Sequence, residues 1–127
     1  MIIVKGKIAA GLGEGQYYIS REGYRNQLIQ KLGIDPFPGT LNLLTSGSSK
    51  EDEVNEVKSI KIEGFKDENR TFGGCICFPA QISGIKCAII KPERTSYPPN
   101  LIEIIAPVNL RNALKLSDGD EVVVVVG

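Results

Sequence analysis

A glycine-dense segment near the start of the chain is the first group of residues that could do chemistry. Successive glycines let backbone N–H groups converge on one anion, as the binding of a polyphosphate requires. The segment consists of Gly11, Leu12, Gly13, Glu14, Gly15 and Gln16. No Gly-Lys-Ser/Thr follows, and a glutamine stands where a dinucleotide fingerprint needs its last glycine, so neither familiar phosphate loop is present. A bulged turn explains these residues equally well.

Thr40 and Asn42 form a second candidate group in a segment that follows a Pro-Gly turn. On a strand, their spacing sends both side chains to one face, while Leu41 between them points toward the core. Magnesium binds hard oxygen ligands and commonly takes only one or two of them from a protein, with phosphate and water completing its shell. Ordinary turn chemistry is the alternative, and these residues alone favour it.

Glu103 is the most conspicuous single residue, because the run Leu101 to Ile105 is otherwise entirely apolar. Burying a polar group without partners costs roughly 2–7 kcal/mol, so this carboxylate must lie at a rim or be held by donors. Burial would favour its protonated form, which suits proton transfer, whereas a charge on an edge strand would only block aggregation. Lys91 to Thr95 is a charged group that could bind phosphate or a polyol, or be a solvated loop.

The chain has no histidine, which excludes Ser-His-Asp and Cys-His catalysis and leaves a carboxylate or a lysine as any base. Cys75, Cys77 and Cys87 are an odd number of cysteines, so we expect reduced thiols and no disulfide framework. The alternation of Cys75 and Cys77 is more typical of a buried strand face than of half a zinc site.

One helix and about seven short strands must position these groups. Tyr24, Leu28 and Leu32 recur every four residues between a suitable N-cap, Ser20, and Gly33, which predicts a helix over about residues 21–32. Strands are expected at Lys5 to Ala10, Thr40 to Leu44, around Ile60 and Ile62, in two runs that meet at Ser83-Gly84, at Leu101 to Ile105 and at Glu121 to Val126. We expect a mobile excursion over Thr45 to Glu53, a turn over Lys66 to Asn69, and a helical turn from Asn109 to about Leu114. Many short strands with one sizeable helix favour a closed or nearly closed β-barrel over a doubly wound sheet.

Composition narrows the possible classes of function. Fifteen basic and fifteen acidic side chains cancel, so no broad positive field exists to attract a nucleic acid. Lys5 and Lys7 interrupt the first apolar run, and no apolar stretch approaches about 18 residues, which argues against a signal peptide or a membrane span. We expect one cytoplasmic domain over residues 1–127 with no nucleic-acid or membrane partner. Its oligomeric state stays open, although a monomer would suffice.

Taken in order, four segments resemble the archaeal CTP-dependent riboflavin kinases. They are GLGEGQYY at 11–18, PFPGTLN at 36–42, KPERTSYP at 91–98 and EIIAPVNLR at 103–111. The resemblance implies a mainly β fold, a six-stranded cradle-loop barrel with one sizeable helix and a short helical turn. It also implies transfer of the γ-phosphate of CTP to the 5′-hydroxyl of riboflavin, with Mg2+ as cofactor and FMN and CDP as products.

The resemblance gives each polar segment a role. The glycine-rich residues 11–16, together with Val108, Asn109, Leu110 and Arg111, would bind CTP or CDP. Thr40 and Asn42 would bind the metal, and Thr95 and Glu103 would contact riboflavin or FMN. On this basis Glu103 is the catalytic candidate: it would orient the hydroxyl that is phosphorylated, and its deprotonation of that hydroxyl is a further hypothesis.

Ser96 stands where the family often has histidine, and we expect no helix-turn-helix extension of the kind that some members carry. Two other functions stay open: a DNA-binding regulator of the related barrel class, which zero net charge disfavours, and a flavin-binding module without catalysis.

Overall fold

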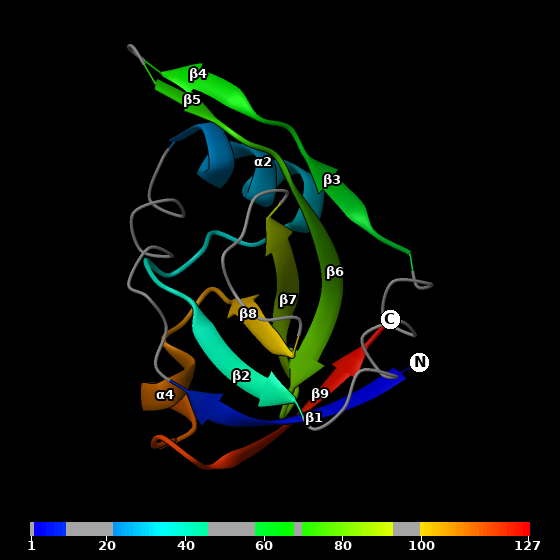
Figure 1. Ribbon diagram of the computed structural model, residues 1–127, viewed down its shortest axis with the longest axis vertical. Coiled ribbons are helices and arrows are strands. Elements are labelled where there is room, and N and C mark those ends of the chain that lie inside the picture. The colour runs from blue at the N-terminus through cyan, green and yellow to red at the C-terminus, as the bar shows by residue number, and fades with distance from the viewer. Residues whose placement is uncertain (1, 10–21, 46–57, 68–69, 93–99) are drawn as a thin grey trace.

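The computed structural model describes residues 2–9, 22–45, 58–67, 70–92 and 100–127. These residues form nine strands and two helices (Figure 1). In chain order they are β1 (Ile2–Ala9), α2 (Glu22–Leu32), β2 (Leu41–Thr45), β3 (Ile60–Ile62), β4 (Phe65–Asp67), β5 (Arg70–Phe72), β6 (Cys75–Ile82), β7 (Ile85–Pro92), β8 (Leu101–Ile105), α4 (Leu110–Ala113) and β9 (Glu121–Val126).

Six of the strands close into an antiparallel barrel. Their order is β6-β7-β8-β2-β1-β9, and β9 pairs back with β6 through Ala80↔Val126 and Gln81↔Val125. β3 pairs with the first residues of β6, beyond the part of β6 that β9 contacts, and β4 and β5 form a separate ribbon. The expected mainly β fold is therefore confirmed, and the described residues contain six barrel strands, one sizeable helix and one short helical turn.

Two hydrophobic cores follow from the alternation of side chains along the barrel strands. Leu43 on β2, Cys87 and Ile89 on β7 and Val124 on β9 are at most 1% exposed and fill the barrel. The intervening Ala88 and Ile90 face the opposite side and join a second core against α2. The same strand thus supplies both cores, which fixes the barrel relative to the helix.

Helix α2 contributes Tyr24, Leu28 and Leu32 to the second core, as their spacing predicts. The helix ends at Gly33, whose φ of 70° suits glycine and whose N–H donates to Ile29 O at 3.0 Å. The hydroxyl of Tyr24 donates to the carbonyl of Gly73, which connects the helix to the segment before β6.

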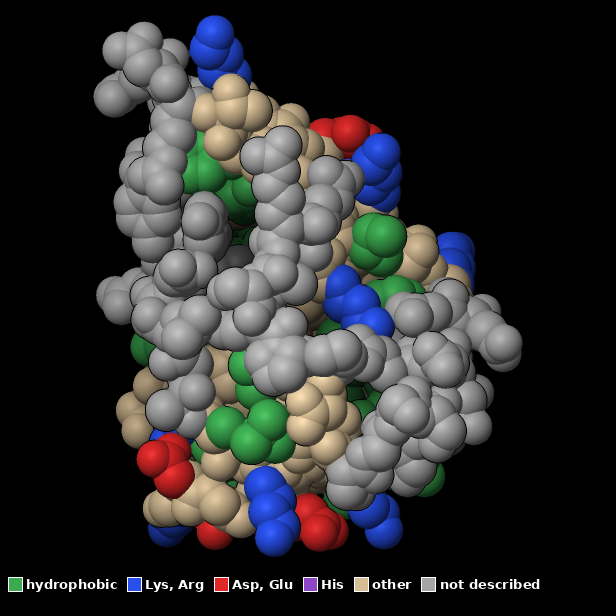
Figure 2. Space-filling model, viewed as in Figure 1, with side chains coloured by type: hydrophobic (Ala, Val, Ile, Leu, Met, Phe, Trp, Pro, Cys, Tyr) green, Lys and Arg blue, Asp and Glu red, His purple; other side chains and the backbone are tan. Residues whose placement is uncertain are grey.

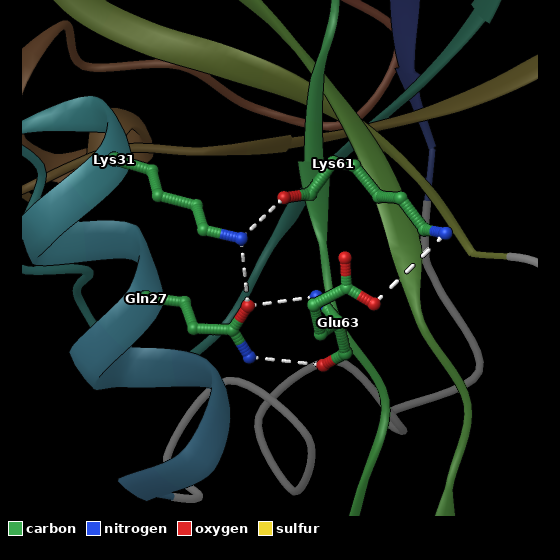
Figure 3. A network of polar contacts seen from close by, with 4 residues as sticks. All are labelled: Gln27, Lys31, Lys61 and Glu63. Carbon is green, nitrogen blue, oxygen red and sulfur yellow. Dashed lines mark hydrogen bonds and ion pairs between the residues drawn. The ribbon is translucent and has the colours of Figure 1, made fainter.

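The polar side of α2 covers the outer edge of β3 (Figure 3). Gln27 acts as a substitute strand partner: its amide nitrogen donates to Glu63 O at 2.9 Å and its amide oxygen accepts from Glu63 N at 2.7 Å. Lys31 Nζ donates to Lys61 O at 2.8 Å. Backbone groups that would otherwise be free for another chain to pair with are therefore satisfied by the helix.

Three expectations about the elements were wrong in part. The first strand begins at Ile2 rather than Lys5, because Ile2 to Val4 already pair with Val126 to Val124 of β9. Thr45 belongs to β2 and is 9% exposed, since its N–H and hydroxyl both donate to Asn100 O. The segment around Lys66 is not only a turn, because β4 and β5 pair there. Most of the expected excursion, residues 46–53, lies outside the described residues.

The other element predictions were confirmed. The two apolar runs form the β6–β7 hairpin, whose turn residues Ser83 and Gly84 have φ values of 49° and 80°. Asn109 caps α4 by accepting from Asn112 N, and Leu114 is its C-cap. The three cysteines are buried and free, Cys75 and Cys77 in the second core and Cys87 in the barrel.

Candidate functional site

Asn42 and Glu103 lie side by side on the outer face of the barrel. They are register partners on β2 and β8, and Leu41 and Leu43 on either side of Asn42 fill the barrel. Their side chains are consequently on the face that carries the second core, where Ile90 is the next partner of Glu103. Asn42 is 7% exposed and Glu103 is 8% exposed, so both polar groups are largely removed from water.

The position of Glu103 resolves the alternatives for that residue. β8 is paired on both sides, with β7 and with β2, so Glu103 is not an edge-strand charge. It is also buried rather than at a solvated rim, and its side chain has an interaction partner. A carboxylate held inside a covered sheet face is typical of a functional or structural polar site rather than of protection against aggregation.

The Oδ1 atom of Asn42 is buried and has no hydrogen-bond partner. A buried acceptor without a donor costs free energy in the ligand-free protein, so such a group calls for a physical reason. A neutral amide oxygen is a hard ligand that a magnesium ion accepts, and the residues therefore fit the expected metal. Within the described part of the chain there is no cluster of three or more Asp, Glu, His or Cys residues that could hold a metal ion.

A cavity of about 140 Å³ lies at the start of β2 and the end of β8. It brings Thr40 together with the predicted nucleotide-binding residues Val108, Asn109, Leu110 and Arg111; its other lining residues are Phe37, Gly39, Leu41, Ile104 and Ala106. Two segments far apart in the sequence form its walls, and a hydrogen bond from Phe37 N to Ala106 O (2.8 Å) joins them. The structure thus brings residues of two segments singled out in the sequence together around one cavity.

Phe37 is one of the lining residues that the sequence pattern missed. Its ring is 40% exposed, as is the side chain of Val108 at 42%, and both line the same cavity. The signal was available, because an aromatic residue between two prolines in a rigid turn has little opportunity to reach the core. Gly39 also forms part of the wall, and its φ of 130° is a conformation that suits glycine.

The remaining predicted site residues, 11–16 and Thr95, lie outside the described residues. The described chain before the glycine-rich segment ends at Ala9, which is the register partner of Asn42. Lys91, at the end of β7 and before Thr95, places its Nζ 5.8 Å from the centre of the Phe78 ring.

The comparison with known proteins gives a family. Residues 8–126 match the family model named CTP-dep_RFKase, whose description reads "Domain of unknown function DUF120". The chain belongs to this CTP-dependent riboflavin kinase family. The family therefore covers β2, β8 and the cavity, and nearly all of the chain around them.

Three members of the family illustrate how similar its curated proteins are to this chain. "Riboflavin kinase" of Methanocella arvoryzae is 60% identical over 121 residues, which cover 94% of this chain and 55% of the relative. "Riboflavin kinase" of Methanosarcina acetivorans is 53% identical over 94% of this chain and 52% of the relative. "Riboflavin kinase" of Ignicoccus hospitalis is 49% identical over 98% of this chain and 71% of the relative.

The chain spans about half the length of most of these curated relatives. None of the helices in the described residues is long and apolar enough to cross a membrane. On the face shown in Figure 2, basic and acidic side chains are interspersed at the lower end.

Proposed function

We propose that this chain transfers the γ-phosphate of CTP to the 5′-hydroxyl of riboflavin, forming FMN and CDP. Two observations support this within a chain of this family. Thr40 and the segment Val108 to Arg111 line one cavity, and Asn42, two residues after Thr40, is the register partner of the buried Glu103. Phosphoryl transfer needs mainly the positioning of two substrates and the neutralisation of charge, so a site without histidine is sufficient.

The lining of the cavity supports the nucleotide as its occupant. The cavity is open to solvent, and its volume of about 140 Å³ can accept a six-membered ring such as a pyrimidine base. Phe37 and Val108 offer apolar surface to the faces of such a ring, and Asn109 and Arg111 supply polar groups beside it. This supports the nucleotide role that the resemblance gave to residues 108–111.

Thr40 and Asn42 are the residues proposed to hold Mg2+. When bound, the ion would neutralise charge on the phosphates, which is what this reaction requires of it. The contribution of the chain is an amide oxygen that no internal donor occupies and a hydroxyl two residues away on the same segment. Because both ligands are neutral, the anionic phosphates of the nucleotide would complete the binding site.

Glu103 is proposed to accept a hydrogen bond from the 5′-hydroxyl of riboflavin and to receive its proton as the bond from oxygen to phosphorus forms. The leaving CDP oxygen takes the electron pair of the broken bond, so charge and atoms balance. Glu103 suits this role because it is buried beside Asn42, which places a carboxylate next to the proposed metal ligand.

An assay of FMN formation tests the proposal. The chain is incubated with riboflavin, Mg2+ and either CTP or ATP, and FMN is separated by chromatography; we expect FMN with CTP only. No FMN with either nucleotide would contradict the kinase function and favour a flavin-binding module, and equal use of ATP would contradict the nucleotide preference. Since most relatives are longer, this experiment also shows whether the present chain is sufficient.

The Glu103→Gln variant tests whether Glu103 acts as a general base, separately from its role in orienting the hydroxyl. The amide keeps the size of the side chain and can still orient the hydroxyl, but it cannot take the proton. We expect kcat to fall by about 10²–10⁴-fold, the usual contribution of a general base, with little change in the KM for CTP. Full turnover by this variant would exclude proton transfer to Glu103.

A further inference from the structure

Arg111 is held at the cavity by an acidic residue to which neither the sequence motifs nor the resemblance gave a role. Its Nη1 atom lies 2.7 Å from Oδ1 of Asp118, and Arg111 lines the cavity. Arg111 belongs to α4, whereas Asp118 lies in the turn that precedes β9. The two side chains are 38% and 69% exposed, so this ion pair lies at the surface of the cavity wall.

The turn that carries Asp118 has a well-defined geometry. Asp120 closes it, because its Oδ2 accepts from Ser117 N at 2.8 Å and its N–H donates to Ser117 O at 3.0 Å. The turn is also bonded to β1, since Gly119 N donates to Ile8 O at 2.8 Å and Ile8 N donates to Asp120 O at 2.9 Å. Asp118 is therefore presented from a segment fixed to the barrel beside the end of β1.

An exposed ion pair of this kind adds little to folding stability, because water screens it. Its effect on a long side chain is different: a free arginine samples many rotamers, and holding one of them removes an entropy cost from ligand binding. The guanidinium has five N–H donors, and one carboxylate contact leaves others for an anion. A restrained Arg111 would thus bind an anionic ligand more tightly than a free one.

We propose that Asp118 is a positioning residue that holds the guanidinium of Arg111 at the cavity, so that its remaining donors bind an anionic group of the nucleotide. This inference rests on the proposed function. It predicts that loss of Asp118 weakens the binding of the nucleotide and leaves the binding of riboflavin unchanged, because Arg111 lines the cavity assigned to the nucleotide.

The Asp118→Asn variant tests the proposal by steady-state kinetics, varying CTP at saturating riboflavin and then the reverse. We expect KM for CTP to rise about fivefold, which corresponds to roughly 1 kcal/mol, the upper end for an exposed pair. KM for riboflavin and kcat stay unchanged. Asp35→Asn is the matched control, because it breaks an equally exposed pair, Arg25 Nε to Asp35 Oδ1 at 2.8 Å, beside α2; all its constants stay at the wild-type values.

A double-mutant cycle tests whether Asp118 acts on nucleotide binding through Arg111. In an Arg111→Ala background, Asp118→Asn is expected to cause no further change in KM for CTP, because the residue it positions is gone. An unchanged or lowered KM in the single variant, or an equal loss in the Arg111→Ala background, would overturn the proposal while FMN formation by the wild type still stands. If the wild type forms no FMN, the proposed function fails. The positioning role of Asp118 is then tested by calorimetric titration of CTP into the wild type and the Asp118→Asn variant. Equal affinities, or no binding by either protein, overturn the positioning role.

Discussion

Replacing Asn42 by leucine should make the ligand-free protein more stable and at the same time inactivate it. Asn42 is 7% exposed and its Oδ1 has no hydrogen-bond partner, so the native state carries an unsatisfied acceptor. Leucine has a similar size, and it exchanges this acceptor for apolar surface on a face that continues into the second core. At Oδ1 the change should therefore remove a cost rather than break a hydrogen bond.

The magnitude follows from the price of an unpaired buried group, about 1–3 kcal/mol. For a chain of this size, each 1 kcal/mol shifts Tm by roughly 4 °C, so we expect Asn42→Leu to melt at least about 4 °C above the wild type. Thr45→Val is the matched control on the same strand, because the Thr45 hydroxyl donates to Asn100 O at 3.1 Å. Losing that satisfied bond should lower stability by about 1 kcal/mol.

Thermal unfolding followed by circular dichroism, without metal or nucleotide, measures both variants. The reasoning requires changes of opposite sign at two buried polar positions of β2. FMN formation should fall by more than about tenfold in Asn42→Leu, as is usual when a metal site loses support, and remain normal in Thr45→Val. If Asn42→Leu lowers Tm by as much as Thr45→Val does, the Asn42 amide stabilises the fold, and the interpretation of its oxygen as a free metal ligand is wrong.

Two further predictions concern the framework of the site. Gln27→Ala should lower the free energy of unfolding in urea by about 1–2 kcal/mol, because Gln27 makes two hydrogen bonds to the backbone of Glu63, directly after β3. Gln30→Ala, on the exposed side of α2, is the control and should change the free energy of unfolding little. Burial raises the pKa of the Cys87 thiol to about 12, so the unfolded chain loses this proton first as pH rises. The contribution of Cys87 to stability should accordingly fall by about 2 kcal/mol between pH 8 and pH 10, and Cys87→Ala should show a correspondingly smaller loss over that interval. An identical pH dependence in the variant would contradict the pKa argument.

Much of the fold could be predicted because its signals are local. The spacing of Tyr24, Leu28 and Leu32 gives α2, and Ser83-Gly84 gives the β6–β7 hairpin. The pairs β4 with β5 and β9 with β6 could not be predicted in this way. The first involves strands of three residues, too short for a clear alternation, and the second joins residues more than forty positions apart.

The site was harder to predict than the fold, since it depends on strand register. Sequence spacing placed Thr40 and Asn42 on one segment but gave no sign that Glu103 would be the neighbour of Asn42. The place of Phe37 in the cavity depends on a contact between distant segments, since its N–H donates to Ala106 O. The Arg111–Asp118 pair is local, but it depends on the course of the turn between α4 and β9. Chemistry-bearing residues could be chosen from their types, whereas their partners could not.

One row of register partners across the barrel shows where the fold departs from good packing. From Ile60 it runs through Cys77, Ile90, Glu103 and Asn42 to Ala9. The first three residues of the row are apolar and either belong to the second core or pack against it. The row then changes to a buried carboxylate, Glu103, and to Asn42, whose amide oxygen has no hydrogen-bond partner. Nothing in barrel stability requires that change, since apolar side chains at both positions would extend the second core at lower cost. A sequence that keeps two polar groups at the centre of a covered face gives up stability there, and an unsatisfied acceptor such as Asn42 Oδ1 is expected where a ligand supplies the missing partner.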